Sequence, residues 1–332
     1  MVSLSVRQGE VESGLRYLNP EKDLKEVSDL LAEAFADQGD EHLQRVLQQM
    51  RLLARLSPWL GAWVFGPGVY GVNIVGFVWV EEGRVVGHAM VQRLDLEGVR
   101  WQIANVAVRR THRGRGIGRA LMEATLEHIS QQGGLWALLQ VRKDNPPAVH
   151  LYRSLGFETV GGEIHWRRTL TSGNELRGVR KHLDLRPLTY HDQAHIRDLE
   201  VRAMSEEERW WRQGVWRRIP EEVGLMPWLF HLLGVRFHWR WGLWEERRLA
   251  AMLDIRGDKR RQHSTLHILV DRHHWGRWEE TLVAEALHVL KRVGVKQVSI
   301  TTEANYPDLA EALQRAGFQV AFHLLNMRRK MA

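Results

Sequence analysis

The 332-residue sequence contains no cysteine. This absence excludes disulfide bonds, zinc sites with cysteine ligands and a nucleophilic thiol. It fits a reducing compartment, and we expect a cytoplasmic protein, since residues 1–14 lack the apolar segment and cleavage site of a secretory signal peptide. Metal-ligand spacing is missing as well, because the adjacent His273 and His274 have no carboxylate at a suitable distance along the chain. We therefore expect no metal site.

Charge is absent from one long stretch, Trp59–Val80, which is long enough to span a membrane. The stretch contains Pro67 and several glycines, however, and it is followed by Glu81-Glu82-Gly83-Arg84 and a second valine-rich run. This order is typical of two strands joined by a tight turn. We expect Val72–Val80 to pair with Val85–Arg93 in a hairpin, and we expect no membrane span.

The overall composition is that of a globular protein. Hydrophobic residues make up 44% of the chain and charged residues 26%, which is enough apolar material for a sizeable core. The length favours two domains of similar size. The net charge of +7 suits an anionic cofactor, an acidic substrate or a nucleic acid.

The most informative segment contains three alternate glycines. An apolar, β-favouring run, Ile103–Val108, precedes Arg113-Gly114-Arg115-Gly116-Ile117-Gly118, and apolar residues at helical spacing follow from Ala120 to Ile129. The pattern predicts a strand, a glycine turn and the N-terminus of a helix. Main-chain N–H groups converge at such a turn, and the helix dipole and the arginines, including Arg119, add positive charge. This arrangement favours binding of a pyrophosphate.

Three families of glycine loop can bind phosphates in this way. A Walker loop requires a Lys-Ser/Thr pair after the last glycine, and a dinucleotide fingerprint requires Gly-x-Gly-x-x-Gly; neither pattern is present. The segment Arg113–Gly118 resembles the Arg/Gln-x-x-Gly-x-Gly/Ala motif of the GCN5-related N-acetyltransferase (GNAT) family. In that family the motif holds the pyrophosphate of acetyl-CoA.

A second motif strengthens this resemblance. The segment Asn145–Phe157 resembles the family signature Asn-x-x-Ala-x-x-x-Tyr-x-x-x-Gly-Phe at each named position. By local chemistry it predicts a short helix that begins at a proline pair and ends at Gly156. The resemblance implies that Tyr152 protonates the departing CoA thiolate and that main-chain groups of the strand pair with pantetheine. The implied cofactor-binding residues are Val106, Ala107, Val108, Arg113, Gly114, Arg115, Gly116, Ile117, Gly118, Arg119 and Asn145.

The order of predicted elements also resembles this family. We expect an α/β fold whose mixed, mostly antiparallel sheet is flanked by helices. The expected elements are a strand at 15–18, helices at 20–35 and 41–56, the hairpin, a strand at 101–108, a helix ending near 132, a strand at 135–141, a helix at 145–155 and closing strands at 157–169.

The pattern then repeats. Residues 171–182 are polar and basic and predict a linker between domains 1–170 and 183–332. Three later segments echo earlier ones in the same order, which predicts two GNAT-like domains in tandem. The second copy has lost the motif: Trp275, Trp278 and Glu280 stand where Arg113, Gly116 and Gly118 stood, and Leu313 replaces Tyr152. We therefore expect a degenerate C-terminal copy that does not bind acetyl-CoA.

The resemblance implies transfer of an acetyl group from acetyl-CoA to a primary amine by direct attack in the N-terminal domain. We expect the acceptor to be a small molecule or a peptide, and the protein to be a monomer or a homodimer. The general base stays open, since Gln102 and Asn105 on the strand before the glycines are not bases. Candidates on neighbouring strands are His88, Glu163 and His165.

Arginines and tryptophans alternate in Arg209–Arg212 and again in Trp216–Arg218. This pattern is found in stacking surfaces for nucleic acids, but also in amphipathic helices that bury their tryptophans. We favour the second interpretation, with Trp211 facing inward, and expect no nucleic-acid partner. The alternative function is a CoA-binding protein, or an interaction protein associated with nucleic acid or the ribosome, with a weak or regulatory acetyltransferase site.

Overall fold

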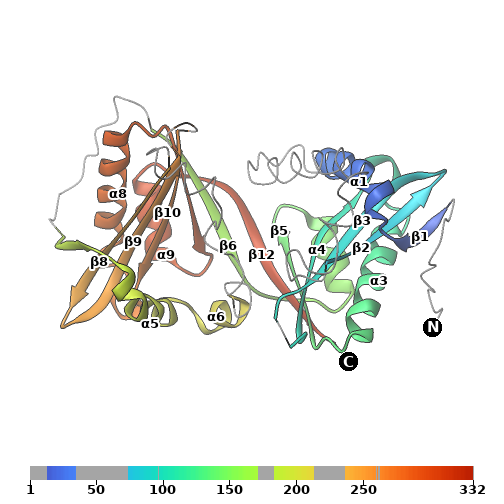
Figure 1. Cartoon of the computed structure of the whole chain (residues 1–332), viewed down its shortest axis with the longest axis horizontal. Coiled ribbons are helices and arrows are strands. Elements are labelled where there is room, and N and C mark those ends of the chain that lie inside the picture. The colour runs from blue at the N-terminus through green and yellow to red at the C-terminus, as the bar shows by residue number, and fades with distance from the viewer. Residues whose placement is uncertain are drawn as a thin grey trace. The chain divides into compact units, whose positions relative to one another are not determined.

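A computed structural model describes residues 13–34, 74–95, 97–170, 183–212, 236–258, 260 and 262–331 (Figure 1). The helix expected at 41–56, the expected linker 171–182 and Trp216–Arg218 lie outside these residues. The chain divides into two compact units. The first unit comprises Met1–Gln140, His150–Glu158 and Met327–Ala332, and the second comprises Val141–Val149 and Thr159–Asn326.

The first unit contains a mixed sheet with strand order β1-β2-β3-β4-β5. Strands β1 to β4 pair antiparallel, and β4 and β5 pair parallel. The elements are β1 (Gly14–Tyr17), α1 (Pro20–Ala34), β2 (Ile74–Glu81), β3 (Arg84–Arg93), β4 (Arg100–Val108), a 3₁₀ turn (Arg110–His112), α3 (Ile117–Gln131), β5 (Trp136–Arg142) and α4 (Pro146–Ser154). The hairpin expected from the valine-rich runs is β2 and β3, which meet at the pair Glu81–Arg84.

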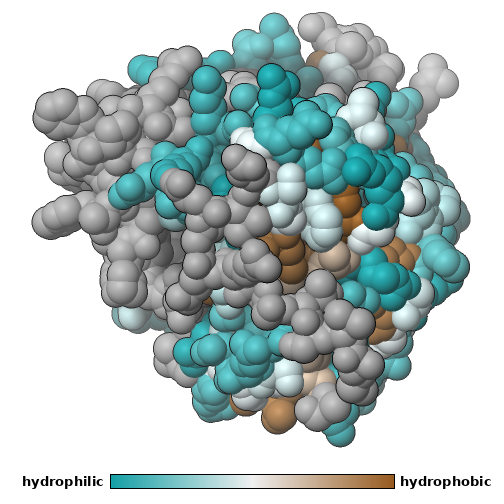
Figure 2. All heavy atoms as spheres, turned by 90° about the vertical axis from the view of Figure 1, so that its right-hand side faces the viewer, coloured by the Kyte–Doolittle hydropathy of each residue, from teal (hydrophilic) through white to brown (hydrophobic). Residues whose placement is uncertain are grey.

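Helices α1 and α3 cover opposite faces of this sheet. Leu30 and Leu31 of α1 pack against Val78 of β2, whereas the neighbouring residue Phe77 contacts His128 of α3. Successive strand residues point to opposite faces, so the two helices enclose the sheet. In the view of Figure 2 hydrophilic side chains predominate among the described residues, and hydrophobic ones show only as small patches. No helix among the described residues is long and apolar enough to cross a membrane.

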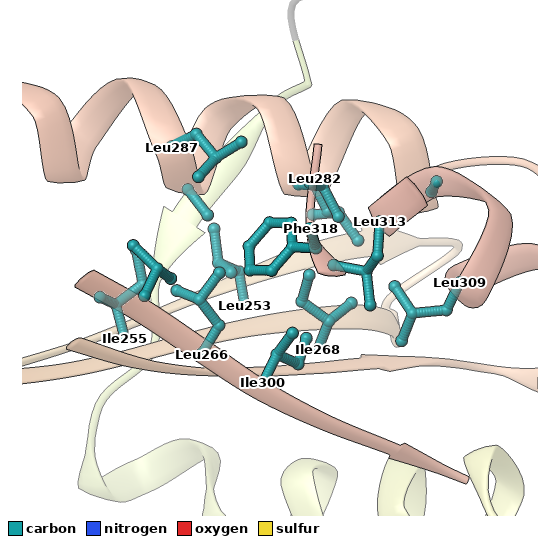
Figure 3. Close-up of a cluster of buried hydrophobic side chains, with 14 of the residues drawn as sticks. Leu253, Ile255, Leu266, Ile268, Leu282, Leu287, Ile300, Leu309, Leu313 and Phe318 are labelled. Carbon is teal, nitrogen blue, oxygen red and sulfur yellow. The ribbon is translucent and has the colours of Figure 1, made fainter. Parts of the chain in front are cut away.

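The second unit contains a sheet with strand order β12-β6-β11-β10-β9-β8-β7. Its elements are β6 (Glu158–Thr169), β7 (Leu185–Pro187), α5 (Gln193–Ala203), α6 (Glu206–Arg212), β8 (Arg236–Glu245), β9 (Arg248–Asp258), β10 (His263–Val270), α8 (Glu279–Val293), β11 (Gln297–Glu303), α9 (Pro307–Arg315) and β12 (Gln319–Lys330). Leu282 and Leu287 of α8 and Leu313 of α9 pack on Leu266 and Ile300 of the sheet (Figure 3). Trp211 of α6 is buried, as expected.

The second half of the sequence repeats the elements of the first half. Helix α8 begins at Glu279, 162 residues after α3 begins at Ile117, and both helices have 15 residues. Strand β11, helix α9 and strand β12 each begin 161 residues after β5, α4 and β6 and have the same lengths. The tandem architecture predicted from the sequence echoes is therefore present.

The two units do not coincide with the two halves of the sequence. Strand β6 ends the first half, yet it pairs antiparallel with β11 of the second half, from Thr169–Gln297 to Glu163–Glu303. The last residues of the chain belong to the first unit, where the Met331 N–H donates to Leu135 O at 2.9 Å and Arg328 pairs with Glu158. Each half thus contributes its final strand segment to the unit built mainly by the other half.

Candidate functional site

Strand β4 carries a β-bulge just before the glycine turn. Its register against β3 shifts between the pairs His88–Ala107 and Met90–Ala104, so β4 holds one extra residue. Asn105 adopts a left-handed conformation there, with φ of 54°. The His88 ring Nδ1 lies 3.1 Å from Asn105 O, which ties the bulge to β3. The bulge redirects the end of β4.

Beyond this point β4 and β5 separate. They pair only from Arg100–Trp136 to Gln102–Leu138, so the rest of β4 up to Val108 has no β5 partner in the described structure. The Arg109 N–H donates to Val86 O of β3 at 2.9 Å, and strand alternation therefore turns the main-chain groups of Val108 away from β3. An extended ligand can pair with such an open edge.

The expected pantetheine-pairing residues Val106, Ala107 and Val108 all lie on this part of β4. Ala107 differs from its neighbours, because it is buried against the α1 side of the sheet and pairs with His88. The main-chain groups of Val106 and Val108, two half-buried residues, therefore form the open edge.

The glycine turn follows directly and leads into α3. Gly114 and Gly116 have φ of 77° and 80°, and a Cβ at either position would meet no atom within 4 Å. These glycines are therefore required by backbone conformation, and open space adjoins them. Gly116 precedes the first residue of α3, the buried Ile117, so the free N–H groups of the first helical turn face the region beside the loop.

Three exposed arginines surround the turn, and each makes side-chain contacts of its own; Arg119 makes one of these with Glu123, at 3.6 Å. Arg113 Nε donates to Val108 O at 3.1 Å and so joins the turn to the end of β4. Arg115 pairs with Glu81 at 3.0 Å, and Arg119 donates to Ser154 Oγ at 2.6 Å. Their positive charges add to the partial positive charge of the helix N-terminus, and this arrangement favours an anionic ligand.

Tyr152 lies on α4, whose neighbouring residues touch the start of α3. Besides the contact of Ser154 with Arg119, a Cβ at Gly118 would lie 3.5 Å from Leu151. The Tyr152 side chain is 6% exposed, and burial raises its pKa to about 12. Its hydroxyl therefore keeps its proton at neutral pH, as a proton donor must.

The ends of α4 match the predicted motif chemistry. Asn145 precedes the helix and accepts a hydrogen bond from the Ala148 N–H at 3.3 Å, which caps its N-terminus. Gly156 ends the helix with φ of 81°, and the Phe157 N–H donates to Tyr152 O at 3.1 Å. The Phe157 ring then packs edge-on against Tyr152, with ring centroids 6.1 Å apart. Gly156 and Phe157 therefore fix the position of the tyrosine ring.

The three candidate bases are divided between the two units. His88 is buried, and this burial lowers its pKa to about 4, so the ring is neutral and holds the bulge carbonyl. Glu163 and His165 lie on β6 in the second unit, 3.6 Å from each other. The general base stays unassigned.

The buried His88 predicts a loss of stability in acid. Its pKa is about 4 in the folded protein against 6.5 for a histidine exposed to water, so its contribution is complete above pH 6.5 and is lost as the pH falls towards 4. We expect the free energy of unfolding of the wild type to fall by about 2 kcal/mol more than that of His88→Asn between pH 7.5 and pH 5. Urea denaturation at both pH values measures the difference. His150→Asn, at an exposed position of α4, should behave as the wild type; an equal loss in His88→Asn would contradict the assignment.

The corresponding turn in the second half is filled by the chain's own side chains. Trp275 stands 162 residues after Arg113, and its Nε1 donates to Val270 O at 3.2 Å, as Arg113 does to Val108 O. The Trp275 ring stacks on Tyr306, with centroids 3.9 Å apart and planes inclined by 14°. Trp278 stands where Gly116 stood, and it is buried.

A carboxylate occupies the start of α8. Glu279 Oε2 accepts from the Trp278 N–H at 3.0 Å, and Glu279 Oε1 accepts from the Tyr306 hydroxyl. The sequence assigned this negative charge to Glu280, but Glu280 is exposed and lies 3.7 Å from Arg315. The buried acid is its neighbour, which is the first residue of the helix. The Glu279 carboxylate thus takes the place at the helix N-terminus that a bound phosphate would otherwise occupy.

Comparisons with known proteins agree with this geometry. The model of the acetyltransferase (GNAT) family matches residues 27–157. A mycothiol acetyltransferase of Thermobispora bispora is 32% identical over 157 residues, covering 46% of this chain and 49% of that protein. The N-alpha-acetyltransferase RimI of Mycobacterium tuberculosis is 39% identical over 80 residues, covering 24% of this chain and 49% of RimI. In the first three curated relatives, the match spans 28% to 49% of their length.

Solved structures resemble the whole chain. A GCN5-related N-acetyltransferase from Sphaerobacter thermophilus has a TM-score of 0.64 at 18% identity, covering 98% of this chain and 97% of that one. A tandem GNAT protein from the clavulanic acid biosynthesis pathway has a TM-score of 0.60 at 16% identity, covering 96% and 98%. At these identities the likeness concerns the fold, and it extends over both halves of the chain.

Proposed function

We propose, from the match of residues 27–157 to the acetyltransferase (GNAT) family, that the chain transfers an acetyl group from acetyl-CoA to a primary amine in the first unit. One observation carries the proposal: the open edge of β4 leads directly into a glycine turn at the N-terminus of α3. An extended, partly peptide-like chain that ends in a pyrophosphate matches both features.

The residues present fit such a cofactor. Gly114 and Gly116 leave open space beside the helix N-terminus, and Arg113, Arg115 and Arg119 supply charge around it. In this proposal the turn binds the pyrophosphate, while Val106 and Val108 pair with pantetheine. Acetyl-CoA, when bound, supplies the thioester carbonyl that the amine attacks. The proposal also assigns Asn145 to the cofactor, by its place in the motif.

The chemistry required of the protein is mainly proton transfer. The amine nitrogen attacks the thioester carbon with its lone pair, the carbon–sulfur bond breaks and its electrons leave on the thiolate. Tyr152 donates its proton to this sulfur, since its raised pKa keeps the hydroxyl protonated until the thiolate forms. The proton lost by the amine goes to water. A main-chain N–H near the bulge polarises the carbonyl oxygen.

A thiol-release assay tests the activity directly. Because the protein has no cysteine, released CoA is the only thiol in the mixture. A thiol reagent therefore measures CoA release with no signal from the protein itself. The names of the relatives suggest two acceptor classes, so the panel contains small primary amines and short peptides with a free N-terminus. We expect amine-dependent release. A protein that neither binds acetyl-CoA nor releases thiol with any amine would contradict the proposal.

Binding should occur once per chain. The pocket of the second half is filled by Trp275, Trp278, Tyr306 and the Glu279 carboxylate, so we expect calorimetric titration of the full-length protein with CoA to give a stoichiometry of one. The full chain is needed because residues 183–332 alone lack β6. A stoichiometry of two would show that the second copy binds the cofactor.

A further inference from the structure

Strand β12 ends in a segment that belongs to the first unit. This end segment, residues 327–332, is held there by Arg328, whose Nε donates to Glu158 at 2.7 Å. The same guanidinium lies 5.1 Å from the ring centroid of Trp136, at the start of β5. The second half of the sequence therefore adds firmly packed residues to the unit that bears the glycine turn.

The end segment places one charged side chain on an apolar strand face. Because alternate strand residues share a face, Met327, Arg329 and Met331 point to the same side of β12. Both methionines are buried, and the arginine between them is half-buried. A charged side chain at such a position needs a partner that compensates for its lost hydration.

The C-terminal end of α4 provides this partner. A Cβ at Gly156 would lie 3.8 Å from Arg329 Nε and 3.9 Å from its Cδ, so the arginine side chain lies beside the residue that ends the helix. The last carbonyl groups of a helix carry partial negative charge, and a cation beside them stabilises the helix end. Tyr152 lies on the last turn of this helix, and its carbonyl accepts from the Phe157 N–H. Arg329 thus lies at the turn that bears the tyrosine.

The second unit contains the same arrangement. The counterpart of this arginine 161 residues earlier, on β6, is Arg168, which is flanked in the same way by the buried Trp166 and Leu170. Arg168 hydrogen-bonds Ala316 O at the end of α9, and a Cβ at Gly317 would lie 3.7 Å from its guanidinium carbon. In each unit, an arginine from the other half of the sequence therefore lies at the C-terminal end of the corresponding helix.

We propose that Arg329 is a positioning residue for Tyr152, supplied by the second half of the chain to the site in the first unit. Its cation holds the last turn of α4, and this turn determines where the Tyr152 hydroxyl lies. The inference rests on the proposed function, in which that hydroxyl protonates the departing thiolate. It gives the second half a part in catalysis although its own glycine-turn position is filled by Trp275 and Trp278.

Arg329→Met tests this role, because methionine resembles the two neighbouring residues and removes the charge with little loss of apolar side-chain volume. We expect the turnover number in the thiol-release assay to fall about tenfold and the KM for acetyl-CoA to stay nearly unchanged, since displacing a proton donor slows the chemical step. Arg329→Lys keeps the charge and should restore most of the turnover. Full turnover in Arg329→Met would overturn the proposal.

Arg168→Met is the matched control. It removes the corresponding arginine from the second unit, where α9 carries Leu313 at the position of the tyrosine. The turnover number should therefore remain that of the wild type. An equal loss of turnover in Arg168→Met and Arg329→Met would mean that the arginines act only through general stability, and it too would overturn the proposal.

A double substitution separates action through Tyr152 from an independent effect. In the Tyr152→Phe protein, Arg329→Met should change the turnover number less than about twofold, because the proton donation that the arginine supports is already lost. The same loss as in the wild-type background would show that Arg329 acts apart from Tyr152, which contradicts the inference.

Fluorine NMR tests the inference without catalysis. The chain contains five tyrosines, so labelling with 3-fluorotyrosine gives few resonances, and the one that is missing in Tyr152→Phe belongs to Tyr152. Arg329→Met should shift or broaden this resonance, whereas Arg168→Met should leave it in place. An unchanged resonance in Arg329→Met would refute the positioning role. A shifted resonance in a protein that acetylates no amine would support the positioning of Tyr152 and refute the proposed function alone.

Discussion

Replacing Tyr152 with phenylalanine is expected to lower the turnover number by about 10²–10⁴-fold and to leave the KM for acetyl-CoA nearly unchanged. The substitution removes only the hydroxyl, and the ring keeps its edge-on contact with Phe157. The thiolate must then take its proton from water, so the loss falls on the chemical step rather than on binding. Steady-state thiol-release kinetics at saturating amine measure both constants.

Tyr190→Phe is the matched control, because Tyr190 is 85% exposed and lies outside the first unit. Tyr152 should also contribute no loss of rate between pH 7 and pH 10, since its pKa of about 12 keeps the hydroxyl protonated across this range. A Tyr152→Phe protein with full turnover, or one whose KM rises in proportion to its loss of activity, would remove Tyr152 from the mechanism.

The second large effect is expected for Gly116→Leu, which should raise the dissociation constant of CoA on the order of 100-fold. A leucine side chain would enter the open space beside the helix N-terminus, where the proposal places the pyrophosphate. Losing one or two charge-assisted hydrogen bonds accounts for an effect of this size. The second half of the chain provides a natural parallel, since the bulky Trp278 stands at this position. Isothermal titration with CoA gives the constant.

Gly133→Leu separates blocked binding from backbone strain. Gly133 follows the C-terminus of the same helix with φ of 73°, and open space surrounds its Cβ position as well. Both substitutions force leucine into the left-handed region at a similar cost of about 1–2 kcal/mol of unfolding free energy. Only Gly116→Leu should weaken CoA binding. Equal affinities in the two variants would mean that the turn does not hold the cofactor.

Local sequence patterns predicted the elements that bear the site. The strand before the glycines, the turn and the helix that starts at Ile117 all follow from residue type and spacing over short distances. Helix α4 could be predicted from the sequence equally well, because the backbone preferences of Pro146 and Gly156 determine where it begins and ends. In these segments neighbouring residues alone determine the conformation.

Features that depend on distant residues were not predictable in this way. No glycine marks the bulge at Asn105 in the sequence. The separation of β4 from β5 depends on two strands, so the sequence of one strand does not predict it. The pairing of β6 with β11 joins residues more than a hundred positions apart, and the periodicity of hydrophobic residues along the chain does not predict such distant pairs. The internal carboxylate was misassigned to Glu280 because helix register decides which of two adjacent glutamates turns inward.

The contribution of β6 and the C-terminal residues to opposite units has a consequence for synthesis. A gene divided after codon 170 would encode two polypeptides, each missing a strand that the other supplies and each exposing an unsatisfied sheet edge. Neither fragment would contain a complete fold, however intact its motif. On the ribosome, the glycine turn is made early, but the unit that bears it receives its last strand segment only after residues 327–332 have been synthesised.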